Sequence, residues 1–206
     1  MIKKLWNSYL QRYSDYCEFP LNLEKEDLTY YRDKLFVSIL LLTLVLGIIS
    51  YVPSAAMAVV LDKWFVLYID TFAILMMLLS TFIKRISLKL RKLLFSSNLF
   101  ILSACLIIDL GLNGNGTILL FIYSVYITLY SGRKAGLYSV LLSALLYVFV
   151  LLIYDLQWLE LNMLRRSDFL VLVITFTNNI MFSLLTVFSI SFLIDQLHAG
   201  LLKQSK

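Results

Sequence analysis

Long uncharged apolar stretches alternate along this chain with short clusters of charged residues. About 20 apolar residues in a helix cross the hydrocarbon core of a bilayer, and six stretches approach or reach that length. We place the predicted spans at about 35–52, 64–83, 93–112, 117–131, 137–154 and 169–194. The pattern therefore predicts an all-α integral membrane protein, a six-transmembrane-helix bundle over residues 28–196.

The first span shows the pattern most clearly. The charged cluster Arg32-Asp33-Lys34 is followed by uncharged, mostly apolar sequence from Leu35 to Ser50, and Pro53 comes soon after. Charge before an apolar run and proline after it are typical of the two ends of a spanning helix. We expect this helix to end or bend near Pro53, with residues 54–63 as a short connection to the second span.

Residues 1–27 precede the bundle and have a different character. Apolar and aromatic side chains such as Leu5, Trp6 and Tyr9 recur at helical spacing between 2 and 17, with basic residues beside them. The pattern predicts an amphipathic helix that ends before Pro20. It either lies in the cytoplasmic interface of the membrane or packs on the bundle as a surface helix.

The distribution of basic residues orients the spans. The chain is 61% hydrophobic with a mean hydropathy of +0.86, and it carries 18 Lys and Arg. With six spans, 15 of these 18 fall in segments on the side of the termini and only Lys63, Arg165 and Arg166 on the other. Basic residues accumulate on the cytoplasmic side. We therefore expect a multi-pass protein of the bacterial inner membrane with both termini cytoplasmic, and we interpret the net charge of +5 as topology rather than nucleic-acid binding.

Four polar side chains inside the predicted spans are candidates for ligand binding: Asp70, Asp109, Asn178 and Asn179. A polar group in hydrocarbon is costly unless it faces protein or water, so each is a functional candidate. If their helix faces converge, the bundle contains a polar cavity in its outer half that could accept a cation, a proton or a small amine-bearing ligand. The alternative is that these residues only fix helix packing. Asp70 would then be protonated, or hydrogen-bonded to a neighbouring Ser, Thr or Tyr, and the asparagines would bond to other helices. Asp109 would be a simple interface residue.

The sequence lacks the patterns of an enzyme. His198 is the single histidine, so histidine-based metal sites and catalytic triads lack their parts. Gly111, Gly114 and Gly116 follow no predicted strand and form a turn rather than a phosphate cradle. We expect no catalytic activity, no metal and no cofactor.

The last span continues into residues 197–206. Ile194, Leu197 and Leu201 keep an apolar line at spacings of three and four as the helix leaves the membrane. Such a line can pair with its copy in a homodimer and pass a signal inward. The alternative is a short cytoplasmic tail that frays.

Several short motifs resemble those of a known class of membrane proteins. They are YYRDKLF at 30–36, YVPS at 51–54, the segment Trp64–Asp70, ISLKLRKLLF at 86–95 and the Gly/Asn-rich turn at 111–116. Through them residues 28–200 resemble the membrane-embedded N-terminal sensor regions of bacterial sensor histidine kinases and related signalling proteins. The resemblance implies an input module whose last helix leads to a PAS, kinase or cyclase domain.

The sequence stops at Lys206 without a catalytic histidine box or an ATP-binding motif. We expect either a sensor region separated from its output or a stand-alone protein that lends the module to a partner. The leading hypothesis is a sensory input module, as in two-component signal transduction. It would detect a small ligand, a cation or a membrane state and relay it to a cytoplasmic kinase or cyclase output. The alternatives are a small transporter or transporter-like subunit, and a structural membrane protein without a ligand.

Overall fold

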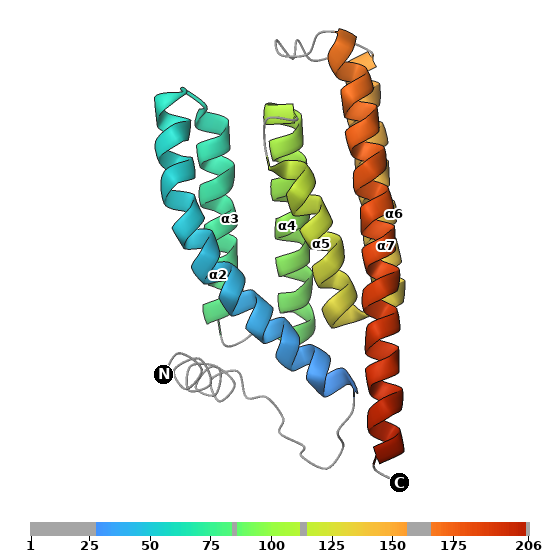
Figure 1. The fold of residues 1–206 in the computed structure, drawn as a ribbon. Coiled ribbons are helices and arrows are strands. Elements are labelled where there is room, and N and C mark those ends of the chain that lie inside the picture. The colour runs from blue at the N-terminus through green and yellow to red at the C-terminus, as the bar shows by residue number, and fades with distance from the viewer. Residues whose placement is uncertain (1–27, 84–85, 112–114, 156–165, 205–206) are drawn as a thin grey trace.

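A computed structural model describes residues 28–83, 86–111, 115–155 and 166–204 of the chain, and nearly all of these residues are helical. The described residues form α2 (Leu28–Val60), α3 (Trp64–Phe82), α4 (Leu88–Leu110), α5 (Gly116–Ser131), α6 (Arg133–Asp155) and α7 (Arg166–Gln204). Consecutive helices run in opposite directions (Figure 1). The all-α class is therefore confirmed, whereas the amphipathic helix predicted in residues 1–27 lies outside the described residues.

Five of these six helices are long and apolar enough to cross a membrane, namely α2, α3, α4, α6 and α7. The remaining one, α5, is an apolar helix of 16 residues. At 1.5 Å per residue it is about 24 Å long, somewhat less than the roughly 30 Å of a hydrocarbon core. A short helix is tolerated here because α5 packs against α2, α4, α6 and α7, which cover most of its surface with protein.

The first helix is longer than predicted. Helix α2 continues through Pro53 to Val60, so residues 54–60 are helix rather than the predicted connection. Proline lacks an amide hydrogen and therefore leaves the carbonyl of Ile49 without its usual helical partner. Prolines are nevertheless accommodated in membrane helices, where neighbouring groups satisfy the freed carbonyl. The helix therefore does not end near Pro53, which corrects that expectation, and the bend expected as the alternative stays a prediction.

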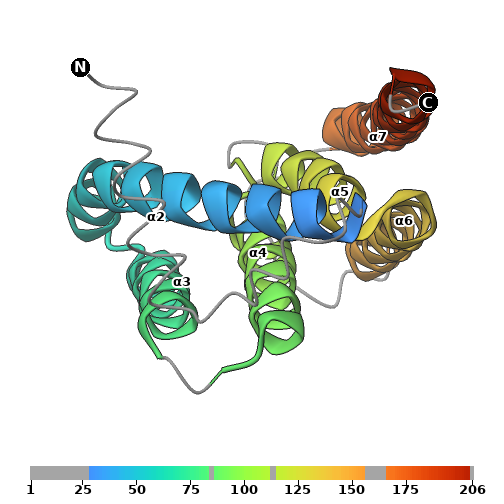
Figure 2. The ribbon, with the colours of Figure 1, turned by 90° about the horizontal axis from the view of Figure 1, so that it is seen from below.

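The helices are arranged as a row that α2 crosses. Helix α2 packs against α3 and α5 and touches α4, and it runs obliquely across the bundle (Figures 1 and 2). Helices α6 and α7 pack against each other and against α5, on the side away from α3 (Figure 2). The centre of the bundle is thus formed by α4 and α5.

The buried core lies where α2, α4 and α5 meet. Phe36 contacts Phe95 edge-on at 5.8 Å between ring centroids, and Tyr130 at 5.0 Å. Such aromatic pairs contribute about 1 kcal/mol each beyond the area they bury. The remaining fully buried apolar side chains of this core include Leu40, Leu41, Ile107, Leu120 and Tyr147.

Candidate functional site

Asp70 forms a polar contact between α2 and α3. The Ser54 hydroxyl donates a hydrogen bond of 2.5 Å to Asp70 Oδ2. One turn away, the Tyr51 and Thr71 hydroxyls form a second bond of 2.7 Å between the same two helices. The side chain of Asp70 is half-buried. The structure thus provides the serine partner that the packing interpretation of Asp70 required.

Asp109 lies near the end of α4 and faces a cation. Its Oδ2 atom is 4.0 Å from Lys63 Nζ, at the turn between α2 and α3, and this atom is buried without a hydrogen bond. An ion pair at that distance is weak when the side chains are partly exposed. Among the described residues, no three His, Cys, Asp or Glu side chains lie together as a metal site would require.

The two adjacent asparagines of α7 differ in their surroundings. Asn179 Nδ2 donates a 2.9 Å bond to the carbonyl of Thr117 on α5, whereas its Oδ1 atom is buried without a partner. Asn178 is exposed on the surface of the bundle. Successive residues of a helix point about 100° apart, so only one of the pair can face α5. The interhelical hydrogen bond expected for Asn179 is confirmed.

The four predicted site residues do not share one cavity. Helix α3 carries Asp70 and packs against α2 and α4, whereas α7 carries Asn178 and Asn179 and packs against α5 and α6 (Figure 2). Asp70 therefore lies on the opposite side of the bundle from Asn178 and Asn179. Ligand binding by each of these residues stays a prediction, without the common outer cavity that would have united them.

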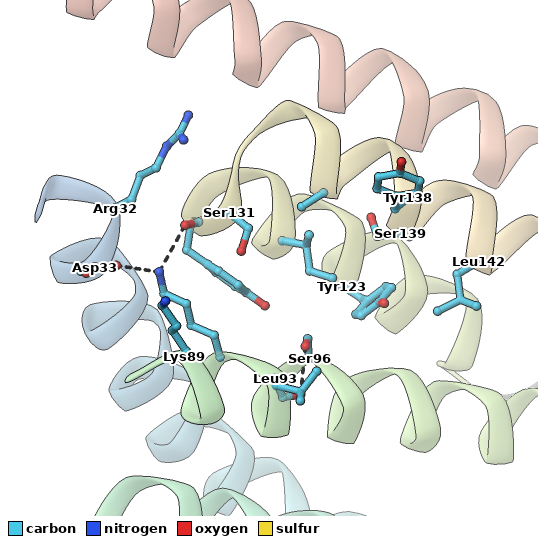
Figure 3. A pocket seen from close by; sticks show the side chains of 14 residues that line it. Arg32, Asp33, Lys89, Leu93, Ser96, Tyr123, Ser131, Tyr138, Ser139 and Leu142 are labelled. Carbon is cyan, nitrogen blue, oxygen red and sulfur yellow. Dashed lines mark hydrogen bonds and ion pairs between the residues drawn. The ribbon is translucent and has the colours of Figure 1, made fainter. Parts of the chain in front are cut away.

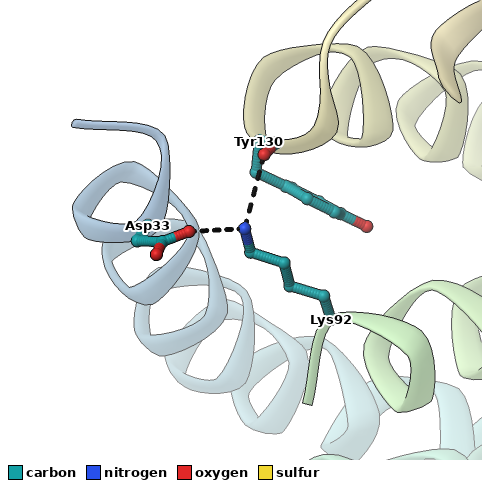
Figure 4. Close-up of polar contacts among 3 residues, drawn as sticks. All are labelled: Asp33, Lys92 and Tyr130. Atoms are coloured by element: carbon teal, nitrogen blue, oxygen red, sulfur yellow. Dashed lines mark hydrogen bonds and ion pairs between the residues drawn. The ribbon is translucent and has the colours of Figure 1, made fainter. Parts of the chain in front are cut away.

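A charged contact was not predicted as a site. It lies at the basic end of the bundle, where α2 begins, away from the predicted outer half. Lys92 Nζ on α4 lies 2.6 Å from Asp33 Oδ1 on α2 and 3.4 Å from the carbonyl of Tyr130 on α5 (Figure 4). The ammonium is also 5.8 Å from the ring centroids of Phe36 and Tyr130. One lysine therefore links three helices at the end where α2 begins.

Next to this ion pair is a pocket with a volume of about 640 Å³ (Figure 3). Its lining side chains come from α2, α4, α5 and α6. The charged ones are Arg32, Asp33, Lys89 and Lys92, and the others include Leu93, Ser96, Tyr123, Tyr130, Tyr138, Ser139 and Leu142. The pocket combines a cationic end with aromatic, hydroxyl and apolar walls.

The turn between α5 and α6 shapes one side of the pocket. Gly132 is the single residue between the two helices, and its φ of +91° favours glycine. A Cβ atom on Gly132 would lie 2.9 Å from Arg32 Nη1, so glycine is also what allows this guanidinium to lie against the turn. Arg32 Nε is buried there without a hydrogen-bond partner.

Arg91 is a second feature that was not identified as a site from the sequence. It is 3% exposed, and its guanidinium donates to three carbonyls at or just after the end of α3: Thr81 at 3.0 Å, Ile83 at 2.8 Å and Ile86 at 3.0 Å. The last carbonyls of a helix have no partner within the helix. The Arg91 guanidinium is the hydrogen-bond donor to these carbonyls, and it thereby fixes the connection between α3 and α4.

The predicted relay residues lie at the end of α7. Ile194 is half-buried and Leu197 is exposed, while Leu201 is helical and its side chain lies outside what the structure describes. Helix α7 runs without a break through all three positions to Gln204. It is the one described element that extends well beyond an apolar span, which ends at Leu197.

Comparison with known proteins adds one finding. The model of the MASE11 protein family matches residues 30–197, which is most of the chain and includes all four intramembrane candidates. No match was found among curated proteins. No solved structure matches either.

Proposed function

The chain belongs to the MASE11 family, and because MASE domains are membrane-associated sensory regions of signalling proteins, we propose that it is an input module that relays a signal through α7. The family match also confirms the resemblance inferred from the short sequence motifs. Sensing of a stimulus and its relay to a cytoplasmic output are the proposal. Its leading support is the geometry of α7.

Helix α7 has 39 residues, from Arg166 to Gln204. At 1.5 Å per residue it is about 58 Å long, nearly twice the thickness of a hydrocarbon core. It packs against α5 and α6 within the bundle and continues beyond its apolar span. A rigid helix of this kind can carry a rotation or shift of the bundle to an output domain joined to its end. Ile194, Leu197 and Leu201 would be the positions that pass the change on.

The charge pattern supports an orientation and a set of partners. The 15 basic residues that the sequence assigns to the side of the termini favour a bacterial inner membrane with that side in the cytoplasm. The output would then be a kinase, as in a two-component system, or a cyclase, joined to or recruited by α7. A second copy of the chain is the expected partner in the membrane, since α7 carries an apolar line past the bilayer.

In the predicted outer half of the bundle, the hydrogen bond between Asp70 and Ser54 is the contact whose strength a stimulus could most readily change. A carboxylate in a bilayer is costly, and here one serine hydroxyl at 2.5 Å is its partner. Binding of a cation or proton at Asp70 would change the strength of this contact between α2 and α3. Only a stimulus with different affinity for two helix arrangements can shift their populations.

We expect Asp70→Asn to change the output of a chimera with a histidine kinase fused after Gln204 by about fivefold, which corresponds to a bias of roughly 1 kcal/mol. Asparagine removes the charge and keeps an oxygen that can accept the Ser54 hydrogen bond. The measurement is kinase autophosphorylation in membranes, normalised to inserted protein.

The matched control is Ser54→Ala, which keeps the charge and removes the bond. A sensing role of the charge predicts a larger effect for Asp70→Asn than for Ser54→Ala. The reverse order would show that the contact serves helix packing alone. Unchanged output from Asp70→Asn under every stimulus tested would contradict the assignment. Flux of solutes in proteoliposomes separates this function from transport, since a sensor moves none.

A further inference from the structure

The pocket at the basic end is an open groove between α4 and α6. Its floor is α5, and α4 and α6 do not pack closely against each other, so the groove faces outward between them (Figures 2 and 3). Leu93 on α4 and Tyr138 and Leu142 on α6 line it and are exposed at the surface of the bundle. Because these helices cross the membrane, such side chains contact lipid. The groove is therefore reached from the bilayer.

Among the described residues, the cations at the end of the groove outnumber the carboxylates. Three cations line it, and the single carboxylate, Asp33, is paired with Lys92 at 2.6 Å. In the part of the chain that the structure describes, no carboxylate lies within ion-pair distance of Arg32 or Lys89. Arg32 Nε is buried and has no hydrogen-bond acceptor, which is costly for a charged donor. A bound anion would satisfy it.

The charged side chains of the groove lie at one of its ends. From Ser131 to Tyr123 on α5 is eight residues, or about 12 Å along the helix axis. Over this distance the lining passes from the charged side chains to a mixture of apolar groups, Leu93, Ile127 and Leu142, and hydroxyl groups, Ser96, Ser139 and Tyr123. The Tyr130 hydroxyl lies close to Ser96 but is buried without a hydrogen bond. The groove thus has a charged end, suited to a phospholipid headgroup, and an uncharged remainder with apolar side chains that an acyl chain could contact.

We propose that this groove binds an anionic phospholipid from the leaflet at the basic end of the bundle. Its phosphate would lie between Arg32 and Lys89, and the upper part of an acyl chain would lie between α4 and α6. Arginine binds phosphate through two parallel hydrogen bonds, and lysine adds a point charge. A phospholipid headgroup and free phosphate present the same anion to these side chains. The opening of the groove toward lipid favours the phospholipid over the free ion.

The proposal deepens the proposed function by naming a ligand, and it depends on that function only for the consequence of binding. The ligand would contact α2, α4, α5 and α6 at once. Its presence would therefore favour one packing of these helices, and α7 packs directly on α5 and α6. Lipid composition is then a membrane state that the module can detect.

The test is titration of the detergent-solubilised full chain with phosphatidylglycerol and, separately, with phosphatidylcholine, with bound lipid counted by native mass spectrometry. Each basic side chain near an anionic lipid contributes roughly a fivefold change in affinity. We therefore expect the double variant Arg32→Gln/Lys89→Gln to bind phosphatidylglycerol about 25-fold more weakly. Phosphatidylcholine binding should be weaker in the wild type and little changed in the variant.

The matched control is Arg133→Gln/Lys134→Gln, which removes one arginine and one lysine from the same end of the bundle. Both side chains are exposed, and neither lines the groove. We expect phosphatidylglycerol binding to be retained in this control. An equal loss in the two double variants would overturn the proposal, because it would show a diffuse attraction between basic residues and anionic lipid.

A second pair of variants distinguishes a lipid from a free anion. Leu142→Trp fills the apolar part of the groove, whereas Leu141→Trp adds the same side chain beside it, at an exposed residue outside the lining. We expect only Leu142→Trp to weaken phosphatidylglycerol binding. If inorganic phosphate competes fully with the lipid and Leu142→Trp has no effect, the phospholipid assignment is wrong. These assays use no output domain, so a failure here leaves the relay through α7 intact, and a silent chimera leaves lipid binding intact.

Discussion

Replacement of Arg91 by alanine lowers the free energy of unfolding by about 3 kcal/mol, as expected when a buried charged donor is removed from its acceptors. The guanidinium joins the end of α3 to α4 through three carbonyls at 2.8–3.0 Å. Without it these carbonyls lose their partner, and a cavity forms in a site that is 3% exposed. Equilibrium unfolding in mixed micelles, followed by the helical signal, measures the loss.

Two further variants identify the cause of that effect. Arg91→Lys should retain part of the stability. An ammonium also donates hydrogen bonds, but it lacks the planar, branched shape with which a guanidinium reaches several carbonyls at once. Lys89→Ala removes a positive charge from the same turn of α4 at an exposed position and should change stability by less than about 0.5 kcal/mol. If Arg91→Ala were as mild as Lys89→Ala, Arg91 would be a surface cation and the account of the α3–α4 connection would be wrong.

The second large effect is expected at Gly116, where α5 lies close against α4. A Cβ atom there would lie 2.8 Å from the carbonyl oxygen of Ser103 and 2.9 Å from the amide nitrogen of Ile107. These are backbone atoms, which cannot turn aside as a side chain could, so the two helices must separate. Gly116→Ala should therefore lower the unfolding free energy by about 2–3 kcal/mol, the usual cost of overpacking.

The same substitution at Gly47 is the matched control. A Cβ atom on Gly47 would meet only Ile74 Cδ1, at 3.4 Å, which is an ordinary contact. Alanine is a better helix former than glycine by about 1 kcal/mol, so Gly47→Ala should leave stability unchanged or raise it. Equal effects of the two substitutions would contradict the close approach of α4 and α5.

The all-α class and the approximate positions of the apolar helices could be predicted from the sequence, because both follow from the length of the apolar stretches along the chain. The number of membrane spans and the orientation inferred from lysine and arginine stay predictions. The extension of α2 past Pro53 could not be predicted, because it depends on whether neighbouring groups satisfy one freed carbonyl. Proline alone does not decide that in a membrane.

The site was harder to predict, because it depends on which side chains from different helices meet. Asp70 was identified from the cost of its charge, but its partner Ser54 and its distance from Asn179 depend on the packing of α2, α3 and α7. The pocket was missed because all basic residues at that end had been assigned to topology.

One signal for Arg91 was present in the sequence. Arg91, Phe95 and Asn98 are spaced at i, i+4 and i+7, so they share a helix face, and all three are buried. A cation on the same face as a core phenylalanine indicates a buried partner rather than a membrane anchor. On α2 the charged Asp33 likewise shares a helix face with the core residue Phe36, three residues further along the chain.

The central claim is that α7 carries the state of the bundle to a cytoplasmic output, and insertions between Leu197 and His198 test it most directly. Seven inserted helical residues rotate the downstream part of the helix by only about 20°, whereas two rotate it by about 160°. With a kinase fused after Gln204, we expect the seven-residue insertion to retain regulated autophosphorylation and the two-residue insertion to abolish regulation. Regulation that survives both insertions equally would contradict a relay through α7.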